Sequence, residues 1–236
     1  MRIRLLAFAV LMAVAMALFT PAAVSAKNWN TTYAVTEHGH QVGNPQAEIT
    51  LASFISYTCP HCATFEKSAD APLRLGFIGL GKVRLEVRPQ IRNPIDLAAA
   101  LLAECGPKEK FFDNHRAIMF AQDKWLPIAE RASSFQRQRW SYGPVPARMR
   151  AIAADLGFYT IMDRRGFSRS ATDRCLSNET RAAQIAADSA AESARYAIPG
   201  TPSFLLNGRL LENVHDWAGV ENALNANLGS GTGKAS

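Results

Sequence analysis

The C-P-H-C sequence at Cys59–Cys62 constrains the fold of this chain more than any other feature, because of what flanks it. Before it, Ala47–Ile55 is an apolar, partly β-branched run that predicts a buried strand. After it, no helix breaker occurs until Pro72, where we expect the helix to stop or kink. Pro60 suits the first helical position, where its missing N–H costs nothing. The segment therefore predicts a strand followed by a helix that begins at the first cysteine.

The two sulfurs of this motif would lie one helical turn apart on the same face, so they can bond or separate with little backbone movement. The thiolate is the nucleophile in disulfide exchange. At the helix start, Cys59 faces unpaired N–H groups and the positive dipole end, which stabilise a thiolate by at most about 2 kcal/mol, or roughly 1.5 pKa units. A larger depression of the pKa needs hydrogen bonds, and Cys62 and the His61 imidazole are the candidate donors. A stabilised thiolate favours the reduced form, which makes the disulfide an oxidant.

The first 26 residues have the pattern of an export signal. Arg2 and Arg4 give a positive start, Leu5–Phe19 is apolar, and Val24–Ala26 is a small-residue cleavage site. The apolar run is shorter than the roughly 20 residues of a membrane-spanning helix, so an uncleaved anchor is the less favoured alternative. Removing residues 1–26 and their two arginines changes the formal charge from +6 to +4, a mild excess that does not argue for a nucleic-acid partner.

After the motif helix, the chain returns to a strand and then changes character. Val83–Arg88 alternates strictly between apolar and charged residues, which predicts a half-buried strand, and a short strand is expected earlier at Tyr33–Thr36. Residues 94–196 show helical patterns only. The predicted helices are Ile95–Glu104, Lys108–Phe120, Pro146–Leu156, Phe167–Leu176 and Asn178–Tyr196.

Strand signals return near the end of the chain. Ser203–Leu206 and Arg209–Glu212 flank Asn207-Gly208, a strong hairpin signal, and His215–Leu228 carries an apolar helical face. We therefore expect an α/β fold in which a thioredoxin-like domain is interrupted by a helical insertion. The expected boundaries are a signal peptide at 1–26, the thioredoxin-like domain at 27–93 and 197–228, the insertion at 94–196 and a flexible tail at 229–236.

A second chemical signal lies at the start of the hairpin, in Gly200–Phe204. An ordinary X-Pro bond is trans, since cis occurs in about 5–6% of such bonds. In a thioredoxin-like fold the expectation reverses: a cis Thr201–Pro202 bond would lie beside Cys59. The Thr201 backbone would then pair with an extended bound peptide.

Taken in order, these residues resemble the DsbA-like periplasmic thiol–disulfide oxidoreductases. The match consists of the C-P-H-C motif with Phe65-Glu66 after it, the helical insertion, and the Gly-Thr-Pro-x-Phe hairpin start, over roughly residues 42–228. The resemblance implies a catalytic site formed by Cys59, Pro60, His61 and Cys62, with Thr201 and a cis Pro202 binding substrate. In this site Cys59 attacks, Cys62 resolves the mixed disulfide and His61 stabilises the thiolate.

The same resemblance extends to partners and location. It implies a periplasmic protein without cofactor or resident metal that acts on unfolded exported proteins and is reoxidised by a DsbB-like membrane partner. We expect a monomer, with no nucleic-acid partner. Two departures concern the redox role. Ser53 stands where enterobacterial members have a buried glutamate, a role for which we expect Glu66 to be too exposed, and Thr201 replaces their valine.

Two other functions stay open at this point. Threonine before the cis proline also occurs in DsbC-like isomerases, so a disulfide isomerase or reductase of the same fold is the first alternative. A metal-binding module using Cys59, Cys62 and a histidine is the second, although a structural zinc site needs four ligands. His38 and His40 could supply them only if Glu37–His40 is not the solvated loop that its glycine-containing sequence predicts.

The two remaining cysteines, Cys105 and Cys175, are expected to form a structural disulfide within the insertion. Cys105 directly follows one predicted helix and Cys175 lies on another, within the same all-helical segment. Export into an oxidising compartment favours pairing over two buried free thiols. The bridge would close a loop of about 70 residues, which the chain-entropy model values at roughly 4 kcal/mol. Because nothing marks either sulfur as a stabilised thiolate, this bridge should be harder to reduce than the Cys59–Cys62 bond.

Overall fold

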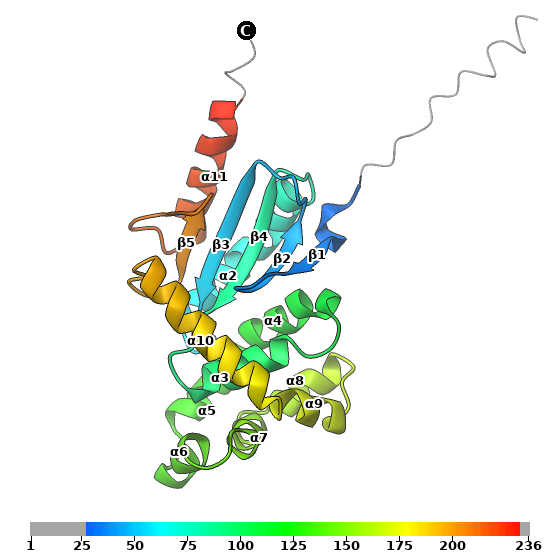
Figure 1. The fold of residues 1–236 in the computed structure, drawn as a ribbon, viewed down its shortest axis with the longest axis vertical. Coiled ribbons are helices and arrows are strands. Elements are labelled where there is room, and N and C mark those ends of the chain that lie inside the picture. The colour runs from blue at the N-terminus through cyan, green and yellow to red at the C-terminus, as the bar shows by residue number, and fades with distance from the viewer. Residues whose placement is uncertain (1–26, 232–236) are drawn as a thin grey trace, which may run out of the picture.

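A mixed β-sheet forms the centre of the protein in the computed structural model, which describes residues 27–231 (Figure 1). In this part of the chain the sheet has six strands in the order β1-β2-β4-β3-β5-β6. β3 and β4 pair in parallel, and every other neighbouring pair is antiparallel. The strands are β1 (Tyr33–Val35), β2 (His40–Gly43), β3 (Ile49–Ile55), β4 (Val83–Pro89), β5 (Ser203–Leu206) and β6 (Arg209–Leu210). The segments before and after the insertion therefore meet in one sheet.

Helices cover both faces of this sheet because its central strand, β3, is apolar on both sides. α2 (Pro60–Leu73) packs on one face, where Phe65 lies 4.5 Å from Phe204 between ring centroids. α11 (Trp217–Gly231) packs against α2 and β3. On the other face, Tyr196 at the end of α10 (Glu179–Arg195) packs against Phe54. Because successive side chains of β3 point to opposite faces of the sheet, they contact different helical layers.

The second strand of the sheet was not predicted, and the expectation of a solvated loop at Glu37–His40 is wrong for its last residue. His40 begins β2 and is only 5% exposed. Its ring stacks on Phe111 of the insertion at 3.8 Å between centroids, and burial lowers its pKa to about 4. A tertiary contact with a residue far along the chain therefore makes His40 a core residue, which local sequence could not indicate.

The motif α-helix ends at Leu73, one residue after Pro72, close to where the sequence predicted a stop or kink. The chain then continues as a π-helical turn, η2 (Arg74–Ile78), in which Gly79 N–H donates to Arg74 O at 2.8 Å.

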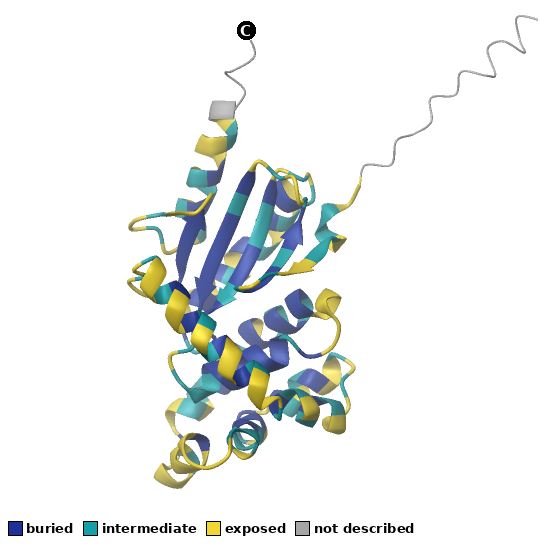
Figure 2. Cartoon of the chain, viewed as in Figure 1, coloured by how far each residue is buried: buried dark blue, intermediate teal, exposed yellow. Residues whose placement is uncertain are grey.

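The insertion consists of helices, as expected, packed around a fully buried one. α3 (Pro94–Ala103) is buried at every position from Asp96 to Ala103, and Figure 2 shows it in the interior of the insertion. Around it are α4 (Phe111–Phe120), α5 (Gln122–Glu130), α6 (Ser134–Ser141), α7 (Val145–Asp155), α8 (Phe158–Arg164) and α9 (Arg169–Leu176), with the short 3-10 turns η1 (Trp29–Thr31) and η3 (Lys108–Lys110) elsewhere.

Three of these helices were missed by the sequence patterns. Pro127 lies inside α5, and α8 is short and preceded by Gly157. α6 begins with a capping box in which Ser133 and Gln136 satisfy each other's backbone N–H groups, a signal that is readable in the sequence. Packing on neighbouring helices supplies the apolar burial that these short segments lack by themselves: α6 and α8 pack on α7, and α5 packs on α4.

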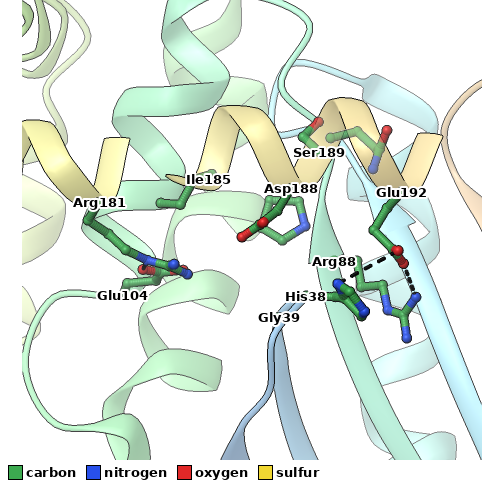
Figure 3. Close-up of a pocket in the computed structure, with 11 residues that line it drawn as sticks. His38, Gly39, Arg88, Glu104, Arg181, Ile185, Asp188, Ser189 and Glu192 are labelled. Atoms are coloured by element: carbon green, nitrogen blue, oxygen red, sulfur yellow. Dashed lines mark hydrogen bonds and ion pairs between the residues drawn. The ribbon is translucent and has the colours of Figure 1, made fainter. Parts of the chain in front are cut away.

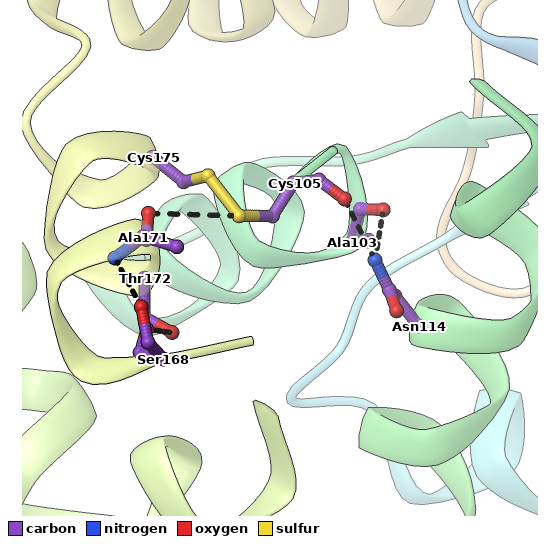
Figure 4. Close-up of a disulfide and its surroundings, with 7 residues drawn as sticks. All are labelled: Ala103, Cys105, Asn114, Ser168, Ala171, Thr172 and Cys175. Atoms are coloured by element: carbon purple, nitrogen blue, oxygen red, sulfur yellow. Dashed lines mark hydrogen bonds between the residues drawn. A yellow bond between two sulfur atoms is a disulfide. The ribbon is translucent and has the colours of Figure 1, made fainter. Parts of the chain in front are cut away.

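A disulfide joins Cys105, just after α3, to Cys175 in the last turn of α9 (Figure 4). Their Cα atoms are 5.6 Å apart and 70 positions separate them along the chain. Beside the bridge, the Asn114 amide donates to Cys105 O at 3.0 Å and to Ala103 O at 3.3 Å. The pair expected from the sequence is therefore bonded in the structure, within the insertion.

Ion pairs tie one end of α10 to the sheet and the other end to α3 (Figure 3). Near its C-terminus, Glu192 pairs with Arg88 of β4 and lies 3.7 Å from His38 Nδ1. Near its N-terminus, Arg181 makes a bidentate pair with Glu104, with N–O distances of 2.6 and 2.7 Å. These partly buried pairs define the position of α10 relative to both the sheet and α3.

The predicted signal peptide at residues 1–26 lies outside the described residues. The predicted tail starts too early, because α11 continues to Gly231. Among residues 27–231, no helix is both long and apolar enough to cross a membrane.

Candidate active site

Cys59 lies at the N-terminus of α2, directly after the loop that follows β3. It is the N-cap residue, with extended backbone angles (φ −93°, ψ 116°), and Pro60 begins the helix. The Ala63 N–H donates to Cys59 O at 3.3 Å and closes the first turn. Cys59 and Cys62 are free thiols with exposed fractions of only 4% and 0%. The structure therefore presents the predicted pair as a dithiol in the first turn of one helix.

The surroundings of Cys59 lower its pKa to about 5. The largest cause is its hydrogen bond with the Cys62 side chain. Burial, which is next in size, opposes this effect, while the Thr201 side chain, the Cys62 N–H and the charge of Arg92 add to it. The depression exceeds what a helix dipole alone supplies. Of the donors considered from the sequence, Cys62 is the one that dominates.

The pKa of Cys62 moves in the opposite direction. Burial raises it well above the ordinary range for cysteine, and interaction with Cys59 raises it further. At neutral pH the pair therefore holds one thiolate, on Cys59, and one proton, on Cys62. In this arrangement the Cys59 sulfur can act as a nucleophile or as a leaving group in disulfide exchange, while the Cys62 sulfur stays neutral.

A cis peptide bond joins Thr201 to Pro202 beside Cys59, as the sequence led us to expect. The Cys59 thiol donates to Thr201 O at 3.1 Å, a bond that the thiolate cannot make because it has no proton. The Thr201 hydroxyl is buried and unpartnered in this protonated arrangement. When Cys59 ionises, the hydroxyl is available as a donor, which agrees with its side chain lowering the pKa of Cys59.

Asp96, which the sequence analysis did not identify, holds the loop that leads to the motif. Its Oδ1 accepts from the Thr58 N–H and the Ser56 hydroxyl, both at 2.9 Å, and its Oδ2 accepts from the Arg92 N–H at 3.0 Å. The carboxyl is fully buried, and burial raises its pKa although these hydrogen bonds oppose the rise. The sequence signal that could have indicated this site is Asn93, a helix N-cap residue whose side chain accepts a hydrogen bond from the Asp96 N–H.

The expectation that Glu66 is too exposed to act in the interior is wrong. Its side chain is 12% exposed, and its carboxylate lies 3.3 Å from Nε2 of the buried His115. The other ring nitrogen of His115 is 3.0 Å from the Tyr57 hydroxyl. Glu66 is covered because α4 packs on α2, a contact across the insertion boundary. Burial raises the pKa of Tyr57, so this hydroxyl stays protonated.

Ser53 is buried in β3, and its hydroxyl has no hydrogen-bond partner in the structure. Its neighbours across the sheet are Val87 and Phe204, both apolar. Ser53 is therefore a small, unpaired polar site, and Glu66 lies elsewhere, beside α4.

A groove of about 630 Å³ opens at the cis-proline loop, and its lining includes Thr201, whose carbonyl accepts from the Cys59 thiol. His61, which is exposed, stands at this groove, while Pro202 and Leu210 are among the residues that line it. His215, also in the lining, lies with Nδ1 2.9 Å from Pro202 O. The groove thus joins the motif helix to the hairpin, with both backbone polar groups and apolar side chains available to a peptide.

No metal site accompanies the cysteines in the described part of the chain, where no three His, Cys, Asp or Glu side chains are grouped to hold an ion. His38 and His40, the histidines that the sequence offered as ligands, have other partners. His38 lies beside Glu192, and His40 stacks on Phe111.

The sheet order, the C-x-x-C motif at the start of α2 and the facing cis proline together define a thioredoxin-like protein of the dithiol–disulfide type. The thioredoxin family model matches residues 35–226, and the chain belongs to this family. The family and the fold class expected from the sequence are therefore confirmed.

Several solved structures and curated proteins resemble the chain. The structure of a protein-disulfide isomerase from Novosphingobium aromaticivorans is 42% identical, covers 83% of this chain and 99% of its own, and has a TM-score of 0.78. Wolbachia pipientis α-DsbA1 is 18% identical, covers 80% and 90% of the two chains, and shares the fold with a TM-score of 0.65. A putative protein-disulfide oxidoreductase from Rickettsia conorii is 28% identical over 80% of this chain, which spans 62% of the length of that relative.

Proposed function

We propose that the protein is a thiol–disulfide oxidoreductase that introduces disulfide bonds into exported proteins. The observation that carries this proposal is the split in acidity of the pair, with the pKa of Cys59 lowered to about 5 and that of Cys62 raised. A couple whose reduced form is stabilised in this way takes electrons from substrate dithiols. The related proteins named as disulfide oxidoreductases or isomerases support the same class of reaction.

The reaction begins with the oxidised pair. A substrate thiolate attacks Cys59 Sγ, the Cys59–Cys62 bond breaks, and Cys62 leaves and takes up a proton. A second substrate thiolate then attacks the substrate sulfur of the mixed disulfide and expels the Cys59 thiolate. The substrate dithiol loses two electrons and two protons, and the protein disulfide becomes a dithiol. Because Cys59 is a stabilised thiolate, it leaves readily in the second step.

The surroundings of the pair have matching roles in this proposal. Pro60 begins the helix at Cys59, and His61 at the groove supports the thiolate from the solvent side. The Thr201 backbone pairs with an extended substrate backbone in the groove, next to the cis Pro202, which also contacts the substrate. Reoxidation is assigned to a DsbB-like membrane partner, and export to the periplasm is assigned to the signal at residues 1–26.

Oxidative refolding tests the proposal. A reduced, unfolded protein with several cysteines is mixed with a stoichiometric amount of the oxidised protein, and recovery of substrate activity is followed. We expect rapid recovery with the native sequence and none above the uncatalysed rate with Cys59→Ser. Equal refolding by the Cys59→Ser variant would disprove the proposal.

An isomerase is the second candidate, favoured by the name of the 42%-identical Novosphingobium structure and by Thr201 before the cis proline. An isomerase uses the reduced pair, whose Cys59 thiolate attacks a wrong substrate disulfide. A reductase of the same fold is part of this alternative, and equilibration with glutathione separates an oxidising pair from a reducing one. A potential near that of thioredoxin, about −270 mV, would favour reduction, whereas one well above that of glutathione would favour oxidation.

A further inference from the structure

One residue of the insertion contacts the backbone of the catalytic loop directly. Gln122, the first residue of α5, is 4% exposed, and its side-chain amide donates to Tyr57 O at 2.6 Å and to Cys59 O at 2.9 Å. Both hydrogens of the amide are used in this way. We infer that Gln122 is a positioning residue that holds Cys59 in its thiolate-stabilising conformation and so sets the redox equilibrium of the Cys59–Cys62 pair.

The polar backbone groups of this loop are divided between two sources. Its N–H groups are bound by α3 and by the loop itself: Thr58 N–H donates to Asp96 of α3, and Cys59 N–H donates to Ser56 O at 3.1 Å. Its carbonyl groups at Tyr57 and Cys59 are bound by Gln122 from the insertion. Cys59, as the N-cap residue, makes one helical bond, in which its carbonyl accepts from the Ala63 N–H, and its backbone angles are not helical. The contacts with Gln122 and Ser56 therefore help to define its extended angles.

The angles of Cys59 matter because its sulfur must meet several donors together. The Cys62 thiol, the Cys62 N–H and the Thr201 side chain all interact with this sulfur. These interactions stabilise a thiolate that exists only in the reduced protein. In the oxidised protein the sulfur is bonded and neutral. A loop that is free to rotate therefore loses free energy mainly in the reduced form, and the protein becomes a weaker oxidant.

The structural disulfide supplies a matched control. Asn114 of α4 is fully buried, and its amide likewise donates to two backbone carbonyls, Cys105 O and Ala103 O. Asn114→Leu and Gln122→Met each remove a buried amide of this kind while keeping a side chain of similar size. Each removes hydrogen bonds to buried backbone carbonyls, although the Cys59 carbonyl keeps the Ala63 N–H as a donor, so both variants are expected to be less stable.

The test measures two quantities that stability alone does not change. The first is the equilibrium constant of the pair with glutathione at pH 7, and the second is the pKa of Cys59 from thiolate absorbance near 240 nm. For Gln122→Met we expect a rise of about one pKa unit and an equilibrium constant about tenfold less oxidising, which is close to 30 mV. For Asn114→Leu we expect a lower melting temperature with both quantities unchanged.

The inference rests on the proposed redox cycling of the pair, and the two can fail separately. If the pair of the native protein does not exchange with glutathione, the proposed function fails. If the native pair exchanges while Gln122→Met changes the glutathione equilibrium constant by less than twofold and leaves the pKa of Cys59 unchanged, Gln122 is only a structural residue. Should Gln122→Met not fold, Gln122→Glu replaces it, because a carboxylate there cannot donate and adds negative charge beside the loop. A pKa of Cys59 that stays unchanged in that variant also overturns the inference.

Discussion

The two cysteine pairs lie at opposite ends of their helices. Cys59 is the N-cap of α2, where N–H groups and the positive dipole end face its sulfur. Cys105 follows the C-cap of α3, and Cys175 lies in the last turn of α9, so both are near carbonyl groups and negative dipole ends. Cys105 Sγ lies 3.9 Å from Ala171 O. The same side chain is therefore an acidic thiol in one region and part of a disulfide beside carbonyl groups in the other.

The comparison shows how one chain can keep a reactive pair and an inert pair in one compartment. The reduced Cys59–Cys62 pair is stabilised because Cys59 is a thiolate, so the disulfide of this pair is easily reduced. Reducing the Cys105–Cys175 bond would create thiolates with no donor arranged for them, and would also release a loop whose ends are 70 positions apart. Four predictions test this contrast, in decreasing order of expected effect.

Removing the bridge in the insertion should have the largest effect, and on stability alone. For the double variant Cys105→Ala with Cys175→Ala, we expect a loss of roughly 4 kcal/mol in the free energy of unfolding, from loop-closure entropy. Urea unfolding of oxidised proteins measures it. The glutathione equilibrium of Cys59–Cys62 should not change. A shift of that equilibrium would mean that the two pairs are coupled, and the contrast would need revision.

The acidity of Cys59 should make the stability of the reduced protein depend on pH. Its pKa is lower in the folded protein, about 5, than in the unfolded chain, about 8.5. The stabilisation is therefore complete above pH 8.5 and disappears as the pH falls through 5. Between pH 7 and pH 4 we expect the reduced native protein to lose about 3 kcal/mol relative to Cys59→Ser. Parallel pH curves for the two proteins would contradict the lowered pKa.

The reactivity of the four sulfurs should differ after mild reduction. We expect iodoacetamide to modify Cys59 with a midpoint near pH 5, at least about 100-fold faster than Cys62, whose raised pKa keeps it protonated. Cys105 and Cys175 should remain linked. Alkylation followed by peptide mapping gives both results at once. Labelling of all four cysteines together would show that the bridge in the insertion is as labile as the active pair.

The smallest effect is expected at Thr201. Thr201→Val removes the buried hydroxyl that supports the thiolate, and we expect the pKa of Cys59 to rise by about one unit, with a roughly tenfold change in the glutathione equilibrium. Thr201→Ser, which keeps the hydroxyl, is the control and should behave like the native protein. If Val and Ser give the same pKa, the hydroxyl plays no part in the acidity of Cys59.

The parts of the site that the sequence predicted are those built from neighbouring residues. A strand, C-P-H-C and a helix place Cys59 and Cys62 together, and the hairpin signal locates Thr201 and Pro202. Asp96, Gln122 and the buried state of Glu66 were not predicted. Each depends on a contact between segments that are distant in the chain: Asp96 reaches back to Ser56, Gln122 to Tyr57 and Glu66 to His115.

The sequence by itself determined the fold class, the helical insertion and the identity of the reactive pair, because apolar period, breakers and motif spacing act over a few residues. Only the tertiary structure decided the acidities. The low pKa of Cys59 and the high pKa of Cys62 come from burial and from donors on other segments, including Thr201. Likewise, the sequence predicted that His40 is part of a solvated loop, but in the structure it is a core residue that stacks on Phe111. Burial and hydrogen-bond partners are properties of the assembled chain, and a local pattern does not contain them.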